Sequence, residues 1–283
     1  MSDNEPTPGH LTEVCLTVPE GKSDILLADL LTMFPRGLQE RPGSLPGTVV
    51  YILHFSGKVC LPDLPGVEVT RRKIPKLNWA QEARKHFEPL EIGPLRIIAP
   101  WMDARDSEDV VIEPGMAFGT GGHESTRLAL RCLLDVMAQS TPTSLLDVGC
   151  GTGILAISAL RLGVSEGIAC DIDQSAVEAT LRNTEANDFL SRLRVERADI
   201  AEADFGSFPL VLANLNAPII TSRAKALADS TSAGGDLVLS GIYREQVERV
   251  VEALSDGFDE VTRIAEGYWF GLRLRRREEV VGD

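Results

Sequence analysis

Apolar residues in the second half of the chain alternate between short runs and helix-spaced positions. The runs predict strands at residues 145–148, 168–169, 193–198, 209–213 and 237–240. The helix-spaced segments between them lie at residues 154–162, 174–187, 217–228 and 245–254. Two further strands are predicted at residues 260–265 and 268–274. This order predicts an α/β domain with a doubly wound, Rossmann-like, seven-stranded sheet that ends in an antiparallel hairpin.

The first hundred residues follow a different pattern. Alternating apolar and polar positions predict strands at residues 11–18, 48–55 and 67–74, with a helix at residues 22–34. This β-α-β-β order indicates a small N-terminal α+β domain of the ferredoxin-like kind, over residues 1–75. Prolines and a glycine in residues 76–100 are typical of an interdomain linker, which leaves residues 101–283 as the larger domain.

Polar residues end four of the predicted parallel strands. They are Asp147, Asp171, Asp199 and Asn214. Because the carboxyl ends of parallel strands meet at one edge of a sheet, these side chains should line a shared crevice. Gly149, Gly151 and Gly153 follow the first of these strands and precede a helix, where bare backbone can touch a ligand and free N–H groups favour acceptors. Asp171 is placed to accept hydrogen bonds from a ribose, so a nucleoside-cofactor pocket is predicted.

The glycine loop alone leaves two cofactors open. Gly151, Gly153 and Ala156 satisfy a relaxed dinucleotide fingerprint, with Asp171 at about the right distance along the chain. The acidic Asp147, two residues before Gly149, instead resembles motif I of class I S-adenosylmethionine-dependent methyltransferases. A nicotinamide-dependent oxidoreductase therefore stays an alternative to a methyltransferase at this point.

Composition and charge narrow the class of protein. The 283 residues are 43% hydrophobic and 25% charged, as in an ordinary globular protein, with a net charge of −14. We expect a cytoplasmic protein without membrane contact, because no apolar run is long enough to span a bilayer and residues 1–10 lack a signal-peptide pattern. The scattered cysteines and histidines predict no metal site. The negative charge disfavours direct binding of nucleic acid and is compatible with a basic protein partner.

Several stretches carry a family resemblance. The most specific is Pro-Gly-Met-Ala-Phe-Gly-Thr-Gly-Gly-His-Glu-Ser-Thr at residues 114–126, just before the helix that precedes the glycine loop. Others are Asn78-Trp79, Ile98-x-Pro100-Trp101, Leu239-Ser240-Gly241-Ile242 and Glu266-x-x-Trp269. Together with the glycine loop, they make the chain closely resemble the bacterial ribosomal protein L11 methyltransferase family over nearly its whole length.

The resemblance implies different functions for the two domains. It implies an N-terminal domain that grips ribosomal protein L11, a flexible linker, and a class I catalytic domain with S-adenosylmethionine as cofactor. The family methylates amines, both lysine side chains and an N-terminal α-amine. We expect the chain to act as a monomer.

The resemblance also implies roles for individual residues. Carried onto this chain, the family's cofactor positions fall at Thr126, Gly149, Asp171 and Asn214. We expect further cofactor contacts, as our own hypothesis, at Gly151, Gly153, Ile172, Asp199 and Ile200. Within this set, Asp171 is assigned to the ribose hydroxyls, Asp199 and Ile200 to the adenine, and Thr126 with the glycines to the methionine end. Asn214, Phe118 and Thr120 are the expected catalytic residues: Asn214 beside the reacting methyl group, and Phe118 with Thr120 in a lid over the site.

Three alternatives to this function stay open on sequence alone. The same chemistry could serve another protein or a small molecule. A nicotinamide-dependent oxidoreductase would also account for the relaxed glycine fingerprint. A non-catalytic assembly factor would bind the cofactor without turning it over.

Overall fold

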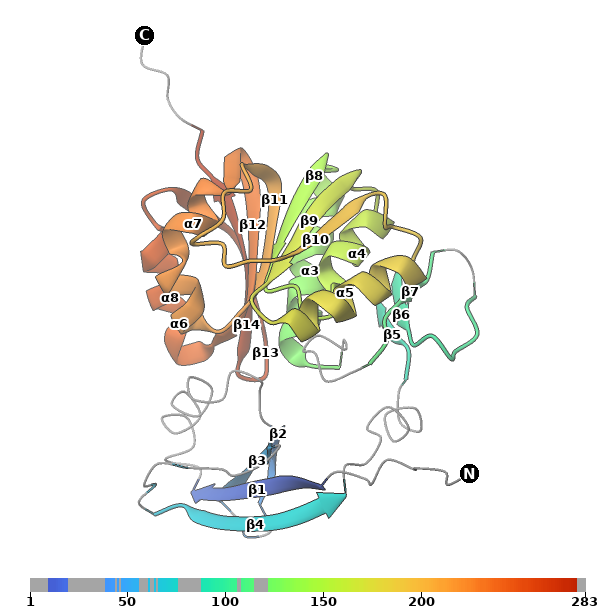
Figure 1. The fold of residues 1–283 in the computed structure, drawn as a ribbon. Coiled ribbons are helices and arrows are strands. Elements are labelled where there is room, and N and C mark those ends of the chain that lie inside the picture. Colours follow the sequence, from blue (N-terminus) through green and yellow to red (C-terminus); the bar gives the residue numbers. More distant parts are fainter. Residues whose placement is uncertain are drawn as a thin grey trace, which may run out of the picture. The chain divides into compact units, whose positions relative to one another are not determined.

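The computed structural model describes residues 10–19, 39–43, 45, 47–55, 61, 64, 66–75, 88–105, 108–114 and 122–278. The chain divides into two compact units, Met1–His86 and Phe87–Asp283 (Figure 1). The predicted helix at residues 22–34 and the predicted lid residues Phe118 and Thr120 lie outside the described residues.

The first unit contains an open antiparallel sheet. Its strands are β1 (His10–Pro19), β2 (Gln39–Pro42), β3 (Thr48–Phe55) and β4 (Glu68–Pro75), in the order β2-β3-β1-β4. The three strands predicted from alternation are present. In β1, for example, Val14, Leu16 and Val18 are buried and the residues between them are more exposed. The sequence prediction missed β2, which is polar, ends in proline and pairs only with β3, as edge strands tolerate.

The second unit is built on a seven-stranded sheet in the order β10-β9-β8-β11-β12-β14-β13. The first five are parallel to their neighbours: β8 (Ser144–Val148), β9 (Glu166–Asp171), β10 (Leu193–Arg197), β11 (Phe208–Asn214) and β12 (Thr231–Tyr243). The last two, β13 (Phe258–Glu266) and β14 (Trp269–Arg276), form an antiparallel hairpin whose second strand pairs with β12. The predicted doubly wound sheet with a terminal hairpin is confirmed.

Helices cover both faces of this sheet (Figure 1). One face is packed by α3 (Glu124–Gln139), α4 (Ile154–Arg161) and α5 (Gln174–Ala186). The other is packed by α6 (Ala217–Ser222), α7 (Ala224–Asp229) and α8 (Val247–Leu254), the last preceded by the short helix η1 (Arg244–Gln246). The sheet therefore has one hydrophobic core on each face. Consecutive strand residues point to opposite faces, so that Leu145 lies in the first core and Leu146 in the second. Burial on both faces explains why the central strand β11 is a nearly continuous apolar run, whereas the edge strand β10 is more polar and less buried.

Two strands of a small third sheet lie within the stretch predicted as linker, residues 76–100, and the third strand follows it. The sheet consists of β5 (Leu90–Ile92), β6 (Leu95–Ile98) and β7 (Val110–Val111). Ile92, Leu95 and Ile97 are buried in the same core as α3 and α4, so the residues from 90 onward are part of the second unit. The glycine and proline that indicated a linker instead form the β5–β6 turn, where Gly93 has a φ of 55°.

A buried ion-pair network fixes α3 to the hairpin side of the sheet. Arg273 of β14 is fully buried, and its Nε donates to Asp236 Oδ1 of β12 at 2.8 Å. Its Nη1 donates to Asp135 Oδ2 of α3 at 3.0 Å, and the same oxygen accepts from Thr262 Oγ1 of β13 at 2.6 Å. Four elements therefore meet at one guanidinium.

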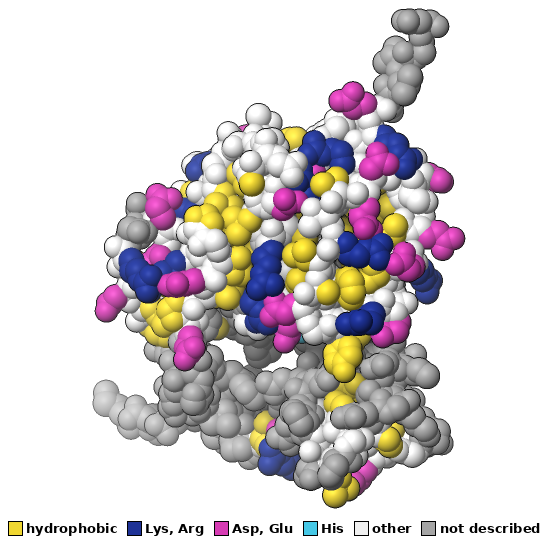
Figure 2. All heavy atoms as spheres, turned by 180° about the vertical axis from the view of Figure 1, so that it is seen from behind, with side chains coloured by type: hydrophobic (Ala, Val, Ile, Leu, Met, Phe, Trp, Pro, Cys, Tyr) yellow, Lys and Arg dark blue, Asp and Glu magenta, His cyan; other side chains and the backbone are white. Residues whose placement is uncertain are grey.

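The surface of the second unit carries charges of both signs. On the face shown in Figure 2, Lys and Arg side chains are interspersed with Asp and Glu side chains and do not gather into one basic patch. Among the described residues, no helix is long and apolar enough to cross a membrane.

Candidate active site

The glycine loop joins β8 to α4 in a conformation that only glycine adopts readily. Gly149, Gly151 and Gly153 have φ values of 70°, 57° and 79°. A Cβ atom on Gly149 would lie 2.4 Å from Leu215 Cδ2, and one on Gly153 would lie 2.7 Å from Thr180 Cγ2. The loop is also tied to β9, because the N–H groups of Gly149 and Cys150 both donate to Cys170 O, at 2.8 and 3.1 Å. The predicted loop therefore lies at the strand ends, between β9 and β11.

Asp171, at the end of β9, is held against this loop. Its Oδ2 accepts from Gly151 N at 3.1 Å and its Oδ1 accepts from Asp173 N at 2.9 Å. Each oxygen keeps further lone pairs, so the carboxylate can still accept from the two hydroxyls of a ribose. The side chain of Ile172 is 65% exposed beside it and offers an apolar surface to a planar base.

Asp199 and Ile200, which were assigned to the adenine, are already engaged within the protein. Residues 198 and 171 are joined by a hydrogen bond from Ala198 N to Asp171 O at 3.0 Å, which brings this segment to the same edge of the sheet. The Arg223 guanidinium donates to both Asp199 oxygens, at 2.9 and 2.6 Å, and holds the pKa of this carboxyl below its usual range. Ile200 is 6% exposed and belongs to the core. An adenine contact from these two residues stays a prediction.

Asn214 and Thr126, which are 88 residues apart, come together at the end of β11. Asn214 Nδ2 donates to Thr126 Oγ1 at 3.5 Å, from β11 to the first turn of α3. Asn214 Oδ1 is buried and has no hydrogen-bond partner among the described residues. Gly241 backs it, with a φ of 82°, and a Cβ there would lie 3.1 Å from this oxygen and 2.6 Å from Leu215 O. An unpaired buried acceptor is costly, so the site is suited to a ligand N–H donor.

Asp147 is a second buried acceptor in this crevice. It is 1% exposed, its Oδ2 accepts from Ala156 N at 3.1 Å, and its Oδ1 has no hydrogen-bond partner among the described residues. Burial raises the pKa of this carboxyl to about 7. From the sequence, Asp147 is placed among the polar strand ends and in the motif before Gly149, but it is assigned no contact with the cofactor.

Helix α5 supports the glycine loop through side chains that the sequence prediction missed. Thr180 Oγ1 donates to Gly151 O at 3.0 Å and Asn183 Nδ2 donates to Thr152 O at 2.8 Å. Asn183 Oδ1 also accepts from Glu113 N at 2.9 Å, just before the stretch at residues 114–126. The available signal was a pair of polar residues at i and i+3 on the helix face that also carries buried apolar residues.

His123 acts as a helix cap and not as a free base. Its Nδ1 accepts from Ser125 N at 3.2 Å at the start of α3, and the ring packs edge-on against Trp269, with 4.7 Å between centroids. Burial lowers the pKa of its imidazole, which favours the neutral ring that the cap requires.

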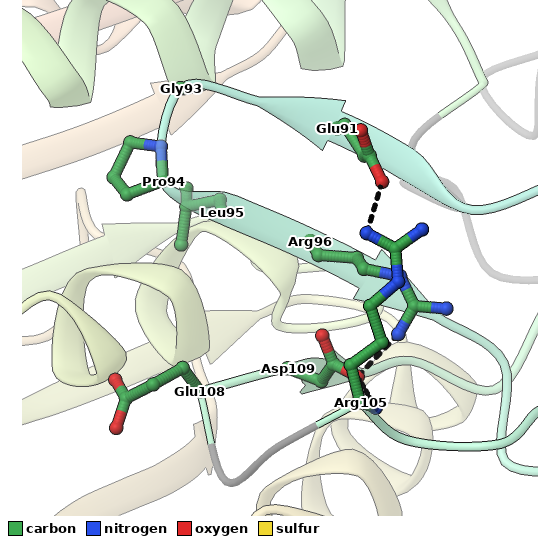
Figure 3. Close-up of a pocket in the computed structure, with 8 residues that line it drawn as sticks. All are labelled: Glu91, Gly93, Pro94, Leu95, Arg96, Arg105, Glu108 and Asp109. Atoms are coloured by element: carbon green, nitrogen blue, oxygen red, sulfur yellow. Dashed lines mark hydrogen bonds and ion pairs between the residues drawn. The ribbon is translucent and has the colours of Figure 1, made fainter.

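A hollow of about 220 Å³ lies elsewhere, on the β5–β7 sheet (Figure 3). It is lined by Glu91, Gly93, Pro94, Leu95, Arg96, Arg105, Glu108 and Asp109. Its charges pair with one another, Arg96 with Asp109 at 2.5 Å and Arg105 with Glu91 at 2.9 Å. None of the predicted site residues lines it. Within the described part of the chain, no group of three His, Cys, Asp or Glu side chains could hold a metal ion.

Comparisons with known proteins agree with this geometry. A family model described as "Ribosomal protein L11 methyltransferase (PrmA)" matches residues 54–277. The ribosomal protein L11 methyltransferase of Pelotomaculum thermopropionicum is 37% identical over 248 residues, which cover 84% of this chain and 80% of that relative. The enzyme of the same name from Syntrophotalea carbinolica is 37% identical over 202 residues, and the match spans 66% of its length, just under two thirds. Among solved structures, the ribosomal protein L11 methylase from Lactobacillus delbrueckii subsp. bulgaricus superposes with a TM-score of 0.61 at 27% identity, over 68% of this chain and 100% of that one.

Proposed function

This chain belongs to the ribosomal protein L11 methyltransferase family, and on that basis we propose that it transfers methyl groups from S-adenosylmethionine to amino groups of ribosomal protein L11. The relatives carry this substrate in their names. The site supports the chemistry because it offers acceptors for a nucleoside at one end and for an amine at the other. A cytoplasmic location and a monomeric state belong to the same proposal.

The observation that carries the proposal is the unpaired Oδ1 of Asn214. This oxygen is buried at the tip of β11, next to the glycine loop. An amide oxygen accepts N–H hydrogen bonds and carries no charge, so it can bind an amine without stabilising its ammonium form as a carboxylate would. Asn214 is therefore suited to hold the amine that receives the methyl group.

The residues present fit the cofactor. Asp171 would hold the ribose hydroxyls, Ile172 would lie against the base, and Thr126 with the glycine loop would hold the methionine end. The buried Asp147, whose Oδ1 is unpaired, provides negative charge or an acceptor near an ammonium at that end. When bound, S-adenosylmethionine supplies an electrophilic methyl group on a sulfonium.

The chain's own residues contribute mainly orientation. Asn214 accepts an N–H of the incoming amine and so directs the nitrogen lone pair toward the reacting carbon. Alignment of two reactants can supply roughly 7–11 kcal/mol in well-placed systems. A lysine with a pKa of about 10.4 must first lose a proton, which at pH 7 costs about 4.6 kcal/mol, whereas an α-amine with a pKa of about 7.7–8.0 needs only about 1 kcal/mol. Because the Asn214 amide is uncharged, it does not stabilise the ammonium form and so does not add to the free-energy cost of deprotonating the amine.

Replacement of Asn214 tests the assignment. We expect Asn214→Ala to lower kcat for L11 methylation about 100-fold or more, the range for loss of one preorganised polar contact. Incorporation of labelled methyl groups, located by mass spectrometry, measures it. Asn216→Ala is a matched control, because Asn216 caps α6 through its bond from Ile219 N and is two residues further along. Equal activity of Asn214→Ala and the control would contradict the role.

Calorimetry separates the two cofactor classes. We expect the intact chain to bind S-adenosylmethionine and to give no binding heat with NAD at the same concentration. Binding of NAD alone would contradict the proposed function.

A further inference from the structure

The Glu266-x-x-Trp269 motif flanks the turn between β13 and β14. Gly267 makes this turn with a φ of 60°, and Tyr268 beside it is 58% exposed. Glu266 ends β13 and Trp269 begins β14. Neither side chain has a part in the methyl transfer proposed above, yet both reach across to α3.

Glu266 contacts two arginines of α3. Its Oε1 accepts from Nε and Nη2 of Arg127, at 2.9 and 2.5 Å, and its Oε2 lies 3.1 Å from Arg131 Nη1. The hydrogen bonds from Arg127 hold the pKa of Glu266 below its usual range. Arg127 Nη1 also donates to Gly122 O, so a single guanidinium joins the carboxylate to the chain just before the helix. The first turn of α3 is therefore held from the hairpin side.

Trp269 packs on His123, the residue that caps this helix. Its ring meets His123 edge-on, with an interplanar angle of 72°, and meets Tyr243 at 4.3 Å between centroids. His123 O in turn accepts from the N–H groups of Thr126 and Arg127, at 3.1 and 3.2 Å. The Trp269 ring thus packs directly against the residue that caps α3.

Thr126 is the residue in this turn that faces the site. It is fully buried and receives the 3.5 Å hydrogen bond from Asn214. We propose that Glu266 and Trp269 are positioning residues that hold the first turn of α3, and with it Thr126, against Asn214. This inference rests on the proposed function, in which Thr126 contacts the cofactor and Asn214 the amine.

Four single variants test the inference. Trp269→Ala and Glu266→Gln each remove one of the two contacts. We expect each to lower kcat/KM roughly tenfold or more, because a misplacement of about 1 Å can lower the rate about 100-fold. Trp269→Phe should recover most of the activity, because a smaller ring can still pack on His123. Tyr268→Ala is the matched control in the same turn, and its activity should stay at the parent value.

A double-mutant cycle tells positioning apart from a general loss of stability. Trp269→Ala is combined with Thr126→Val, and the dissociation constant for S-adenosylmethionine is measured for all four chains. If Trp269 acts through Thr126, its effect should shrink when Thr126 is already replaced. Effects that multiply to within about twofold would overturn the inference, since independent sites are additive.

Hydrogen exchange gives a readout that needs no cofactor. In Trp269→Ala, the amides of Thr126 and Arg127 should lose protection, while those of α5 keep theirs. Unchanged protection in α3, in a chain that still binds S-adenosylmethionine, would overturn the positioning role alone. Failure of the parent chain to bind S-adenosylmethionine would instead overturn the proposed function, whatever the exchange result.

Discussion

At the scale of single residues, the site depends on a few side chains whose oxygens face the crevice. Asp171 is bound by two backbone N–H groups, while Asp147 and Asn214 each keep a buried oxygen unpaired. Fixed acceptors of this kind lose no freedom when a ligand arrives, which favours binding.

Asp171→Ala should weaken binding of S-adenosylmethionine about 100-fold or more. The reason is the loss of charge-assisted hydrogen bonds to the ribose, worth about 1.5–3 kcal/mol each. Calorimetry measures the dissociation constant. Asp173→Ala serves as control, because Asp173 caps α5 through a bond from Ser175 N and its loss should affect stability more than binding. Unchanged affinity of Asp171→Ala would refute the ribose assignment.

Asp147 predicts a pH dependence of stability. Its pKa in the folded chain, about 7, lies above the ordinary value of 3.8. The folded state therefore holds the proton more tightly, and stability from this group is present below about pH 4 and is lost as pH rises through 7. As the pH rises through this window, the free energy of unfolding of the isosteric Asp147→Asn variant should increase relative to that of the parent chain. The increase should reach up to roughly 4 kcal/mol, at about 1.36 kcal/mol per pKa unit. Urea unfolding at several pH values checks this; a difference that does not change with pH would contradict it.

At the scale of elements, apolar periodicity located the parallel strands and the helices between them, except that the one helix predicted at residues 217–228 is two helices, α6 and α7. Strand ends also brought Asp147, Asp171 and Asn214 to one edge, as their positions predicted. The pairing of Asn214 with Thr126 was not readable in this way, because it depends on how α3 packs across the sheet. The same holds for the support that Thr180 and Asn183 give the loop.

Two local features could not be interpreted correctly from the sequence. Gly93 and Pro94 mark a tight turn, but they do not reveal whether the flanking strands are free or packed, which is decided by the burial of Ile92 and Leu95. The edge strand β2 has the sequence Gln-Glu-Arg-Pro, which shows no apolar alternation, so periodicity could not reveal it.

The ion pair between Asp236 and Arg273 should be important for the stability of the second unit. Both side chains are buried, at 3% and 0% exposure, so Asp236→Ala would leave the guanidinium with only the more exposed Asp135. Removal of one partner of a buried pair costs about 3–5 kcal/mol. Chemical unfolding measures this. As a control, Asp229→Ala removes the exposed pair with Lys225 and should cost at most about 1 kcal/mol. Equal effects of the two variants would contradict the expectation.

At the scale of the whole molecule, the candidate site lies in one of the two compact units of the chain. The glycine loop, Asp171, Asn214 and Thr126 all belong to the unit Phe87–Asp283. The recognition role of the first unit stays a prediction.

Deletion of residues 1–86 tests that role. The shortened chain should bind S-adenosylmethionine with the affinity of the intact chain, because the described cofactor residues all remain. It should lose methylation of L11, because the surface expected to grip that protein is gone. Calorimetry and methyl incorporation measure the two properties, with circular dichroism to verify that the shortened chain is folded. Full turnover of L11 by this chain would refute recognition by the first unit.

Among the strands of the described residues, β13 has a neighbour on one side only, because it ends the open seven-stranded sheet. An unpaired strand edge is a template on which a second molecule can extend the sheet. Here the strand carries Arg263, which is paired with Glu248 of α8 and with Glu260. A second chain that added itself along β13 would have to displace these ion pairs and bring its own charges against them. We therefore expect the charged edge to disfavour aggregation by strand addition.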